Sequence, residues 1–306
     1  MIETDLTQDT DEVVHHAAYL APRTLDQALA LLGEQGDEAK VVAGGQSLLV
    51  FLRQGLLTPR YLIGLKRIPE LARLELTPDG GLTIGAMVTQ YALETSPVVR
   101  ERFPALAEAA AVIASPQVRR QGTLGGNLCH ADPTGDPPAA LIALGAEVEL
   151  VRQGSSRRLP VADLFRDYME PAIEADELLV VVHLPAPEPR SGAAYLKYRL
   201  RGVDTALVGV GVGLTLAADG RTCAAARIGL VGAGVTPLRV VAAEAELSGR
   251  EPTDGVLQAA GEAAAAECSP LSDTEASEEY RRQMVKVFVR RAAERALQRA
   301  RGGDGA

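Results

Sequence analysis

Hydrophobic and polar positions follow two different periods along the chain, and these periods predict both helices and strands. In residues 24–35 apolar side chains recur every three or four positions, which predicts an amphipathic helix that begins at a Thr24–Gln27 capping box. A longer helix is expected at residues 97–114 and a short one at 162–167. Short apolar runs bounded by glycine, proline or aspartate predict buried strands at residues 40–43, 61–65, 82–86, 147–151 and 178–184.

The last third of the chain predicts a small sheet with helices on one side. Strands are expected at residues 195–200, 206–216 and 225–231, with a hairpin turn at Asp219–Gly220 and helices starting at Pro237, Asp254 and Ala276. In the middle strand, valine and glycine alternate, so that one face is apolar and the other has no side chains. Such a bare face allows a helix or a ligand to approach the sheet closely.

The prolines at 185, 187 and 189 predict a stiff linker and divide the chain into residues 17–187 and 191–301. Residues 1–16 are acidic and lack lysine and arginine, which is typical of a mobile tail. We therefore expect two folded domains after a short acidic segment.

Composition excludes several function classes. The net charge of −9 disfavours a general affinity for nucleic acid. No apolar run approaches the roughly 18 residues of a membrane span and no signal peptide is recognisable, so a cytoplasmic protein is expected. The three cysteines form no CxxC pair, so we predict neither an iron–sulfur cluster nor a structural metal site in this chain.

Two loops pair adjacent glycines with small polar residues. The first is formed by Ala43, Gly44, Gly45, Gln46, Ser47 and Leu48, and the second by Thr123, Leu124, Gly125, Gly126 and Asn127. Backbone N–H groups of such loops, helped by a helix N-terminus, make a cradle for an anion, and two cradles suit a diphosphate held from both sides. The alternative is that each glycine pair only forms a turn.

Other candidate residues carry weaker signals. Gly232–Ala233–Gly234 lacks the third glycine of a dinucleotide fingerprint, because Pro237 stands there, and the chain has no P-loop motif. Asp136 is expected to accept hydrogen bonds from a ribose, to cap the helix that follows, or to do both. Cys129 and His130 are interpreted as structural, since nothing nearby completes a catalytic or metal-binding set, and no catalytic side chain is predicted.

The two loops make the chain resemble a known family, the FAD-binding medium subunits of molybdenum hydroxylases such as carbon monoxide dehydrogenase and xanthine dehydrogenase. The motifs that carry the resemblance are AGGQSLL at 43–49, TLGGNLCHADPTGD at 123–136, DELLVVVHLP at 176–185 and YLKYR at 195–199. The resemblance implies an α+β fold: a two-subdomain FAD-binding domain, residues 17–187, followed by a small α+β C-terminal domain, residues 191–301.

The resemblance also implies which residues touch the cofactor. Both glycine loops match the FAD diphosphate site, and Asp136 matches the acidic residue of the nucleotide site. Leu179 matches a residue whose backbone lies near the flavin ring, and Lys197 matches a lysine at the polar edge of that ring. Ile113 stands where some relatives have an aromatic residue, which argues against flavin stacking there.

The role implied by the resemblance is electron transfer within a complex, a dimer of heterotrimers. A molybdopterin-binding large subunit oxidises the substrate, a small subunit with two [2Fe–2S] clusters passes the electrons on, and this chain delivers them from FAD to NAD, a quinone or oxygen. One alternative is a stand-alone flavin oxidase of the same fold, although no His or Cys beside AGGQS offers a covalent tether. A second alternative is a nucleotide-binding module without redox activity.

Overall fold

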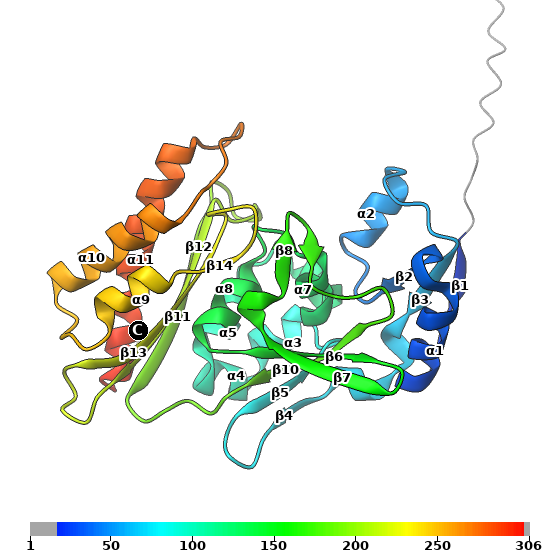
Figure 1. Cartoon of the computed structure of the whole chain (residues 1–306), viewed down its shortest axis with the longest axis horizontal. Helices are drawn as coiled ribbons and strands as arrows, with labels where there is room; N and C mark the ends of the chain where they lie inside the picture. Colours follow the sequence, from blue (N-terminus) through cyan, green and yellow to red (C-terminus); the bar gives the residue numbers. More distant parts are fainter. Residues whose placement is uncertain (1–16, 303–306) are drawn as a thin grey trace, which may run out of the picture.

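The computed structural model describes residues 17–302, which form three parts along one long axis (Figure 1). A small N-terminal sheet stands at one end, a five-stranded sheet with six helices lies in the middle, and a four-stranded sheet with three helices forms the other end. This arrangement confirms the predicted α+β fold. The expected acidic tail, residues 1–16, lies outside the described residues. No helix within residues 17–302 has the length and apolar character that a membrane crossing requires.

The N-terminal part is a three-stranded parallel sheet in the order β1-β3-β2. Its elements are β1 (Ala18–Leu20), α1 (Leu25–Gln35), β2 (Ala39–Val42), α2 (Leu48–Arg53) and β3 (Tyr61–Gly64). The Thr24 hydroxyl accepts the Gln27 N–H as predicted, whereas the Gln27 side chain returns to the Arg23 N–H. The first glycine loop therefore connects β2 to α2.

The middle part is an antiparallel sheet in the order β4-β5-β10-β6-β7. Its strands are β4 (Leu74–Leu76), β5 (Leu82–Gly85), β6 (Glu147–Arg152), β7 (Ser155–Pro160) and β10 (Leu178–Leu184), with a small hairpin of β8 (Phe165–Asp167) and β9 (Glu170–Pro171). The helices are α3 (Gln90–Thr95), α4 (Pro97–Arg102), α5 (Pro104–Ala111), α6 (Pro116–Gln121), α7 (Leu124–His130) and α8 (Asp136–Ala143). Apolar side chains of sheet and helices share one core.

Two helix predictions in this part are wrong. The expected helix at 97–114 is broken between α4 and α5, because Pro104 lacks the amide hydrogen that a continuous helix would use. The expected helix at 162–167 is a 3₁₀ turn, Val161–Asp163, followed by β8. So short a segment does not repay the cost of helix nucleation by itself.

The C-terminal part is an antiparallel sheet in the order β11-β12-β13-β14. Its strands are β11 (Ser191–Tyr198), β12 (Val208–Leu216), β13 (Cys223–Val231) and β14 (Leu238–Arg239), and its helices are α9 (Val241–Leu247), α10 (Asp254–Glu267) and α11 (Glu278–Ala300). The predicted hairpin turn is present, with Gly220 at a φ of 68°. The helix expected from Pro237 begins later, because Leu238 and Arg239 first pair with β13.

The bare face of β12 receives a helix of the middle part. A Cβ placed on Gly211 would lie 2.2 Å from the Ala139 carbonyl oxygen, and one on Gly213 would lie 2.3 Å from the Ala143 carbonyl oxygen. The backbone of α8 thus rests directly on the sheet, while the valines of β12 face α9, α10 and α11 on the other side. Of the two predicted occupants of this face, helix or ligand, the structure shows a helix at these two glycines.

Candidate functional site

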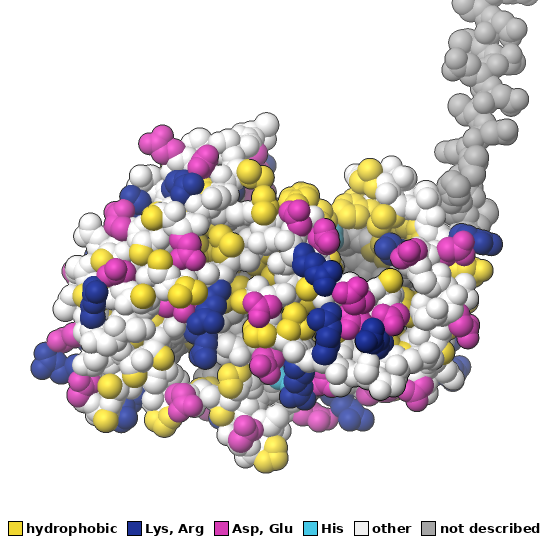
Figure 2. Space-filling model, viewed as in Figure 1, with side chains coloured by type: hydrophobic (Ala, Val, Ile, Leu, Met, Phe, Trp, Pro, Cys, Tyr) yellow, Lys and Arg dark blue, Asp and Glu magenta, His cyan; other side chains and the backbone are white. Residues whose placement is uncertain are grey.

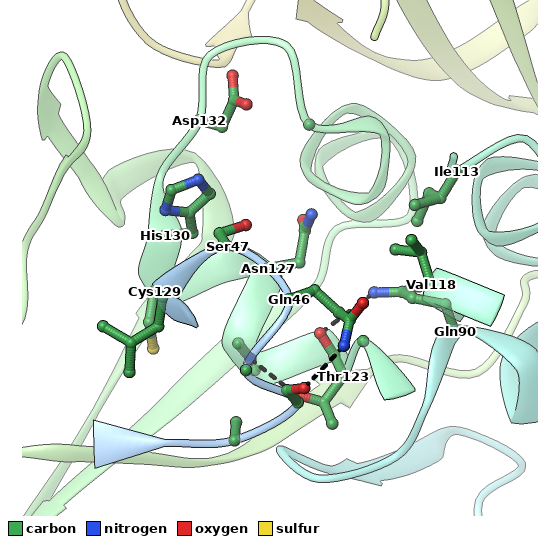
Figure 3. Close-up of a pocket in the computed structure, with 18 of the residues that line it drawn as sticks. Gln46, Ser47, Gln90, Ile113, Val118, Thr123, Asn127, Cys129, His130 and Asp132 are labelled. Carbon is green, nitrogen blue, oxygen red and sulfur yellow. Dashed lines mark hydrogen bonds between the residues drawn. The ribbon is translucent and has the colours of Figure 1, made fainter. Parts of the chain in front are cut away.

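A pocket of about 640 Å³ opens where the three parts meet, a size typical of small-molecule and cofactor sites. All three parts contribute to its walls. The two glycine loops lie at its base, with Cys129 and His130 on one side and Ile113 and Val118 on the other (Figure 3). Every residue predicted to bind the cofactor lines the pocket except Leu124, which is buried beneath it.

The first loop supplies free hydrogen-bond donors. The backbone N–H groups of residues 44–48 have no acceptor in the part of the chain that the structure describes. Gly45 adopts a φ of 71°, a left-handed conformation that glycine tolerates, and the Gln46 side chain holds the turn by donating to the Gly44 carbonyl at 3.1 Å. Five consecutive unused donors at the start of α2 form a nest suited to an anion.

The second loop differs from the sequence expectation, because its amides are already used. The N–H groups of Leu124 and Gly125 donate to the carbonyls of Val88 and Ala86, and the Gly126 N–H donates to the Thr123 hydroxyl. This loop is the first turn of α7, capped by Thr123. It offers the pocket a helix N-terminus and a surface without side chains rather than a second nest of free amides.

The two loops lie side by side, as predicted. A Cβ on Gly126 would be 3.3 Å from the Ala43 Cβ. A Cβ on Gly44 would be 2.2 Å from the Gln121 carbonyl oxygen, just before the second loop. Glycine at position 44 is therefore required by contact between the first loop and the end of α6, which leads into the second loop.

Strand β10 forms the back wall at Leu179. Its pairing with β6 shifts register between Leu179 and Val181, and the bulged residue Val180 accepts the Ala86 N–H at 2.9 Å. The bulge turns this part of β10 towards the second loop. Leu179 is buried and lines the pocket.

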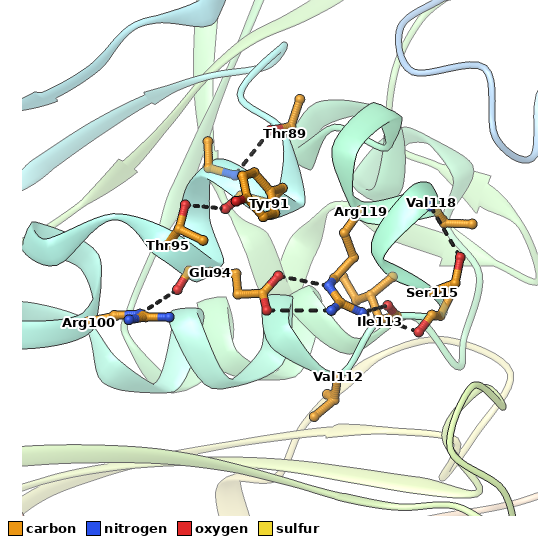
Figure 4. A network of polar contacts seen from close by, with 12 residues as sticks. Thr89, Tyr91, Glu94, Thr95, Arg100, Val112, Ile113, Ser115, Val118 and Arg119 are labelled. Atoms are coloured by element: carbon orange, nitrogen blue, oxygen red, sulfur yellow. Dashed lines mark hydrogen bonds and ion pairs between the residues drawn. The ribbon is translucent and has the colours of Figure 1, made fainter.

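A further wall comes from residues 112–115, between α5 and α6, and it is held by one arginine (Figure 4). The Arg119 guanidinium binds the Glu94 carboxylate at 2.8 Å and donates to the Ile113 carbonyl at 2.9 Å. Ala114 has a φ of 35°, a strained value for a residue with a side chain. Arg119 thus fixes the aliphatic wall that includes Ile113.

Asp136 and Lys197 form a buried ion pair at the pocket. The Lys197 Nζ lies 2.9 Å from Asp136 Oδ2 and also donates to the Val112 carbonyl at 3.2 Å. The Tyr195 hydroxyl donates to Asp136 Oδ1 at 2.6 Å. Burial raises the pKa of Asp136, and the Lys197 ammonium and Tyr195 hydroxyl oppose that shift. Gly135 is the N-cap of α8 and Asp136 makes no capping bond, so the capping interpretation is wrong.

Several pocket residues were not identified from the sequence. Cys129, interpreted as structural, lines the pocket with an exposed side chain. His130 contacts Phe51 with ring centroids 5.5 Å apart and ring planes tilted by 56°, and burial lowers the pKa of its imidazole. Gln90, at the start of α3, also lines the pocket. A lone glutamine carries no pattern that would have revealed it.

The pocket fits the FAD that the resemblance implies. Its free amides match an anionic group, and buried polar oxygens at its edge need donors: Gln90 Oε1 and Asn127 Oδ1 have no hydrogen-bond partner within residues 17–302. Its remaining walls are largely aliphatic. No cluster of metal-binding side chains occurs among the residues that the structure describes.

Comparison with known proteins covers nearly the whole chain. Residues 13–187 match the family model described as the FAD binding domain in molybdopterin dehydrogenase, and residues 193–296 match the CO dehydrogenase flavoprotein C-terminal domain. The chain is 36% identical to the 6-hydroxypseudooxynicotine dehydrogenase complex subunit alpha of Paenarthrobacter nicotinovorans, over 92% of this chain and 95% of that protein. It is also 36% identical to the carbon monoxide dehydrogenase medium chain of Hydrogenophaga pseudoflava, over 90% and 94%. A solved structure of carbon monoxide dehydrogenase from Hydrogenophaga pseudoflava superimposes with a TM-score of 0.89 at 37% identity, over 93% of this chain and 98% of that one.

Proposed function

The chain belongs to the family of FAD-binding medium subunits of molybdenum hydroxylases, and from this we propose that it carries electrons from the [2Fe–2S] clusters of a partner subunit to an external acceptor. It is thus a flavoprotein subunit of an oxidoreductase. The observation that supports the proposal best is the run of five backbone amides at residues 44–48 that have no acceptor among the described residues, in a loop that contacts the start of α7.

In this proposal each part of the pocket holds one part of FAD. The free amides of the first loop would bind the diphosphate. Thr123, Gly126 and Asn127 would line the other side of the same site. Leu179 and Ile113 would contact the flavin ring, and Lys197 would lie at its polar edge, since all three line the pocket. The bound flavin supplies the electron-transfer chemistry, and the chain positions it and excludes water.

The cation at Lys197 is expected to favour electron uptake. A positive charge near the ring stabilises the negative charge that develops on the flavin as it accepts electrons. The neighbouring Asp136 carboxylate offsets part of that charge, because the two groups are 2.9 Å apart and their side chains are 2% and 5% exposed. The reduction potential therefore depends on the geometry of the pair.

We also propose the partners that such a role requires. These are a molybdopterin-binding large subunit and a small subunit with two [2Fe–2S] clusters, assembled as a dimer of heterotrimers. Leu49 and Val50 on α2 and Leu56 in the loop after it are exposed apolar side chains, adjacent in sequence to the pocket residues Leu48, Phe51 and Leu57. Figure 2 shows a hydrophobic patch in this part of the molecule, which is consistent with a covered surface there.

Isolation of the complex through a tag on this chain tests the proposal. We expect iron and molybdenum to co-purify with one FAD per chain. After anaerobic reduction by dithionite, flavin absorbance at about 450 nm should recover when the acceptor that the complex uses, whether NAD, a quinone or oxygen, is added.

The matched control is the same complex stripped of FAD. Its iron–sulfur clusters should still be reduced, and electron delivery to the acceptor should be lost. Undiminished delivery without FAD would contradict the proposed role, and reduction of the isolated FAD-loaded chain by a small substrate would favour the stand-alone oxidase instead.

A further inference from the structure

Tyr195 does not line the pocket, but its hydroxyl donates to Asp136, and Asp136 and its ion-pair partner Lys197 both line the pocket. Tyr195 and Lys197 are two residues apart on β11, so both point to the same face of the sheet. Their polar atoms meet on one carboxylate of the middle part: Tyr195 on Asp136 Oδ1 at 2.6 Å and Lys197 on Asp136 Oδ2 at 2.9 Å. Each carboxylate oxygen therefore has its own donor.

The neighbouring strand leaves space for the Tyr195 hydroxyl. Gly209 of β12 is paired with Lys197, and a Cβ there would lie 2.3 Å from the Tyr195 oxygen and 2.5 Å from a methyl group of Val231. Any side chain at position 209 would displace the phenol from Asp136. The glycine that the sequence analysis assigned to a bare face thus makes this hydrogen bond possible.

Among the residues that the structure describes, the hydrogen bonds of Lys197 leave one of its three donors free. An ammonium group has three N–H donors, and those of Lys197 that face the protein meet Asp136 Oδ2 and the Val112 carbonyl. Because Tyr195 occupies Oδ1, the carboxylate is held with a single oxygen towards the ammonium. Arg199 donates to the same Val112 carbonyl at 3.0 Å and adds positive charge, while Glu108 accepts the Tyr195 N–H at 2.8 Å and fixes the strand.

We infer that Tyr195 is a positioning residue for the flavin: its hydroxyl holds Asp136 so that Lys197 keeps one N–H and a net positive field directed at the ring. The inference rests on the proposed function, because it requires the flavin ring beside Lys197. Without the hydroxyl, Asp136 turns both oxygens to Lys197 and compensates its charge more completely. The bound flavin then becomes harder to reduce.

The experiment measures the two-electron reduction potential of the FAD-loaded protein in the wild type and in three single variants. Tyr195→Phe should make reduction about tenfold less favourable, which is about 30 mV for a two-electron couple. Lys197→Met should lower the potential further. Tyr198→Phe is the matched control, since the Tyr198 hydroxyl contacts only the Tyr280 hydroxyl among the residues described and does not line the pocket.

A double-mutant cycle distinguishes positioning from a structural role. In an Asp136→Asn background, Tyr195→Phe should no longer change the potential, because the carboxylate through which it acts is gone. If Asp136→Asn does not retain FAD, the same cycle is read in Lys197→Met. An unchanged or raised potential in Tyr195→Phe, or a shift that persists in full in these backgrounds, overturns the inference.

The outcomes also separate this inference from the proposed function. If Lys197→Met lowers the potential and Tyr195→Phe does not, the ring lies beside Lys197 and only the role of Tyr195 is wrong. If Lys197→Met leaves the potential unchanged, the ring does not lie beside Lys197, and this inference fails together with the proposed ring placement, whereas the electron-transfer role is judged by the FAD-stripped complex.

Discussion

Replacing Gly44 by alanine tests whether contact between the two loops is needed to bind FAD. The added Cβ would lie 2.2 Å from the Gln121 carbonyl oxygen and 2.9 Å from the Gly122 Cα. Both are backbone atoms and cannot rotate away. Because Cβ contacts below 3.0 Å essentially never occur, the loops would have to separate by at least 0.8 Å, the difference between 3.0 Å and 2.2 Å.

Overpacking of this kind typically costs about 1–3 kcal/mol. If the loops relax apart in the free protein and must close on the cofactor, the cost falls on binding, and the Kd for FAD rises by about 5- to 150-fold. The assay is titration of the apo-protein with FAD, followed by flavin fluorescence, with thermal melting as a check on folding.

Gly255→Ala is the matched control, because it is the same change at a helical site where a Cβ meets nothing within 4 Å. It should leave FAD binding unchanged. Wild-type affinity in Gly44→Ala would refute the reasoning, since the two loops would then bind the cofactor without touching one another.

Of three further predictions, two concern the pocket and one concerns the packing of α8 on β12. Gly45→Val should reduce FAD binding, whereas Gly45→Asn should retain most of it. A Cβ at this position faces Leu49 at 3.2 Å, and the backbone needs a left-handed φ of 71°, which asparagine tolerates. Equal loss of FAD binding in both variants would indicate that the side chain blocks the diphosphate directly. Removal of FAD should allow a thiol reagent to label Cys129, because this exposed side chain lines the pocket, whereas equal labelling with FAD bound would place the cofactor elsewhere. Gly211→Ala should lower the free energy of unfolding in urea by about 1–3 kcal/mol, because its Cβ would lie 2.2 Å from the Ala139 carbonyl, and an unchanged midpoint would contradict the close packing of α8 on β12.

The sequence predicted the elements and the place of the site well where the signal was local. Strand β10 and helix α10 begin where predicted, because apolar runs and polar boundaries determine them. The position of both glycine loops followed from their composition alone. The helix break at Pro104 and the later start of the helix expected from Pro237 were not predicted. The effect of a proline depends on what the flanking residues pair with in the folded protein.

Contacts between distant segments could not be predicted. Nothing local shows that Asp136 meets Tyr195, 59 residues away, rather than capping its own helix. The use of the second loop's amides by Val88 and Ala86 likewise depends on how β5 and α7 come together. The resemblance supplied Lys197, and the structure added the pairing that governs its charge.

The seating of α8 on β12 has a consequence for how the chain unfolds. All eight residues of α8 are buried, and the helix contacts the sheet of the C-terminal part as well as α5 of the middle part. A fragment that stopped at the proline linker would present this helix to water along the side that β12 now covers. The halves should therefore melt together in a single cooperative calorimetric transition, and each should be less stable alone than within the intact chain.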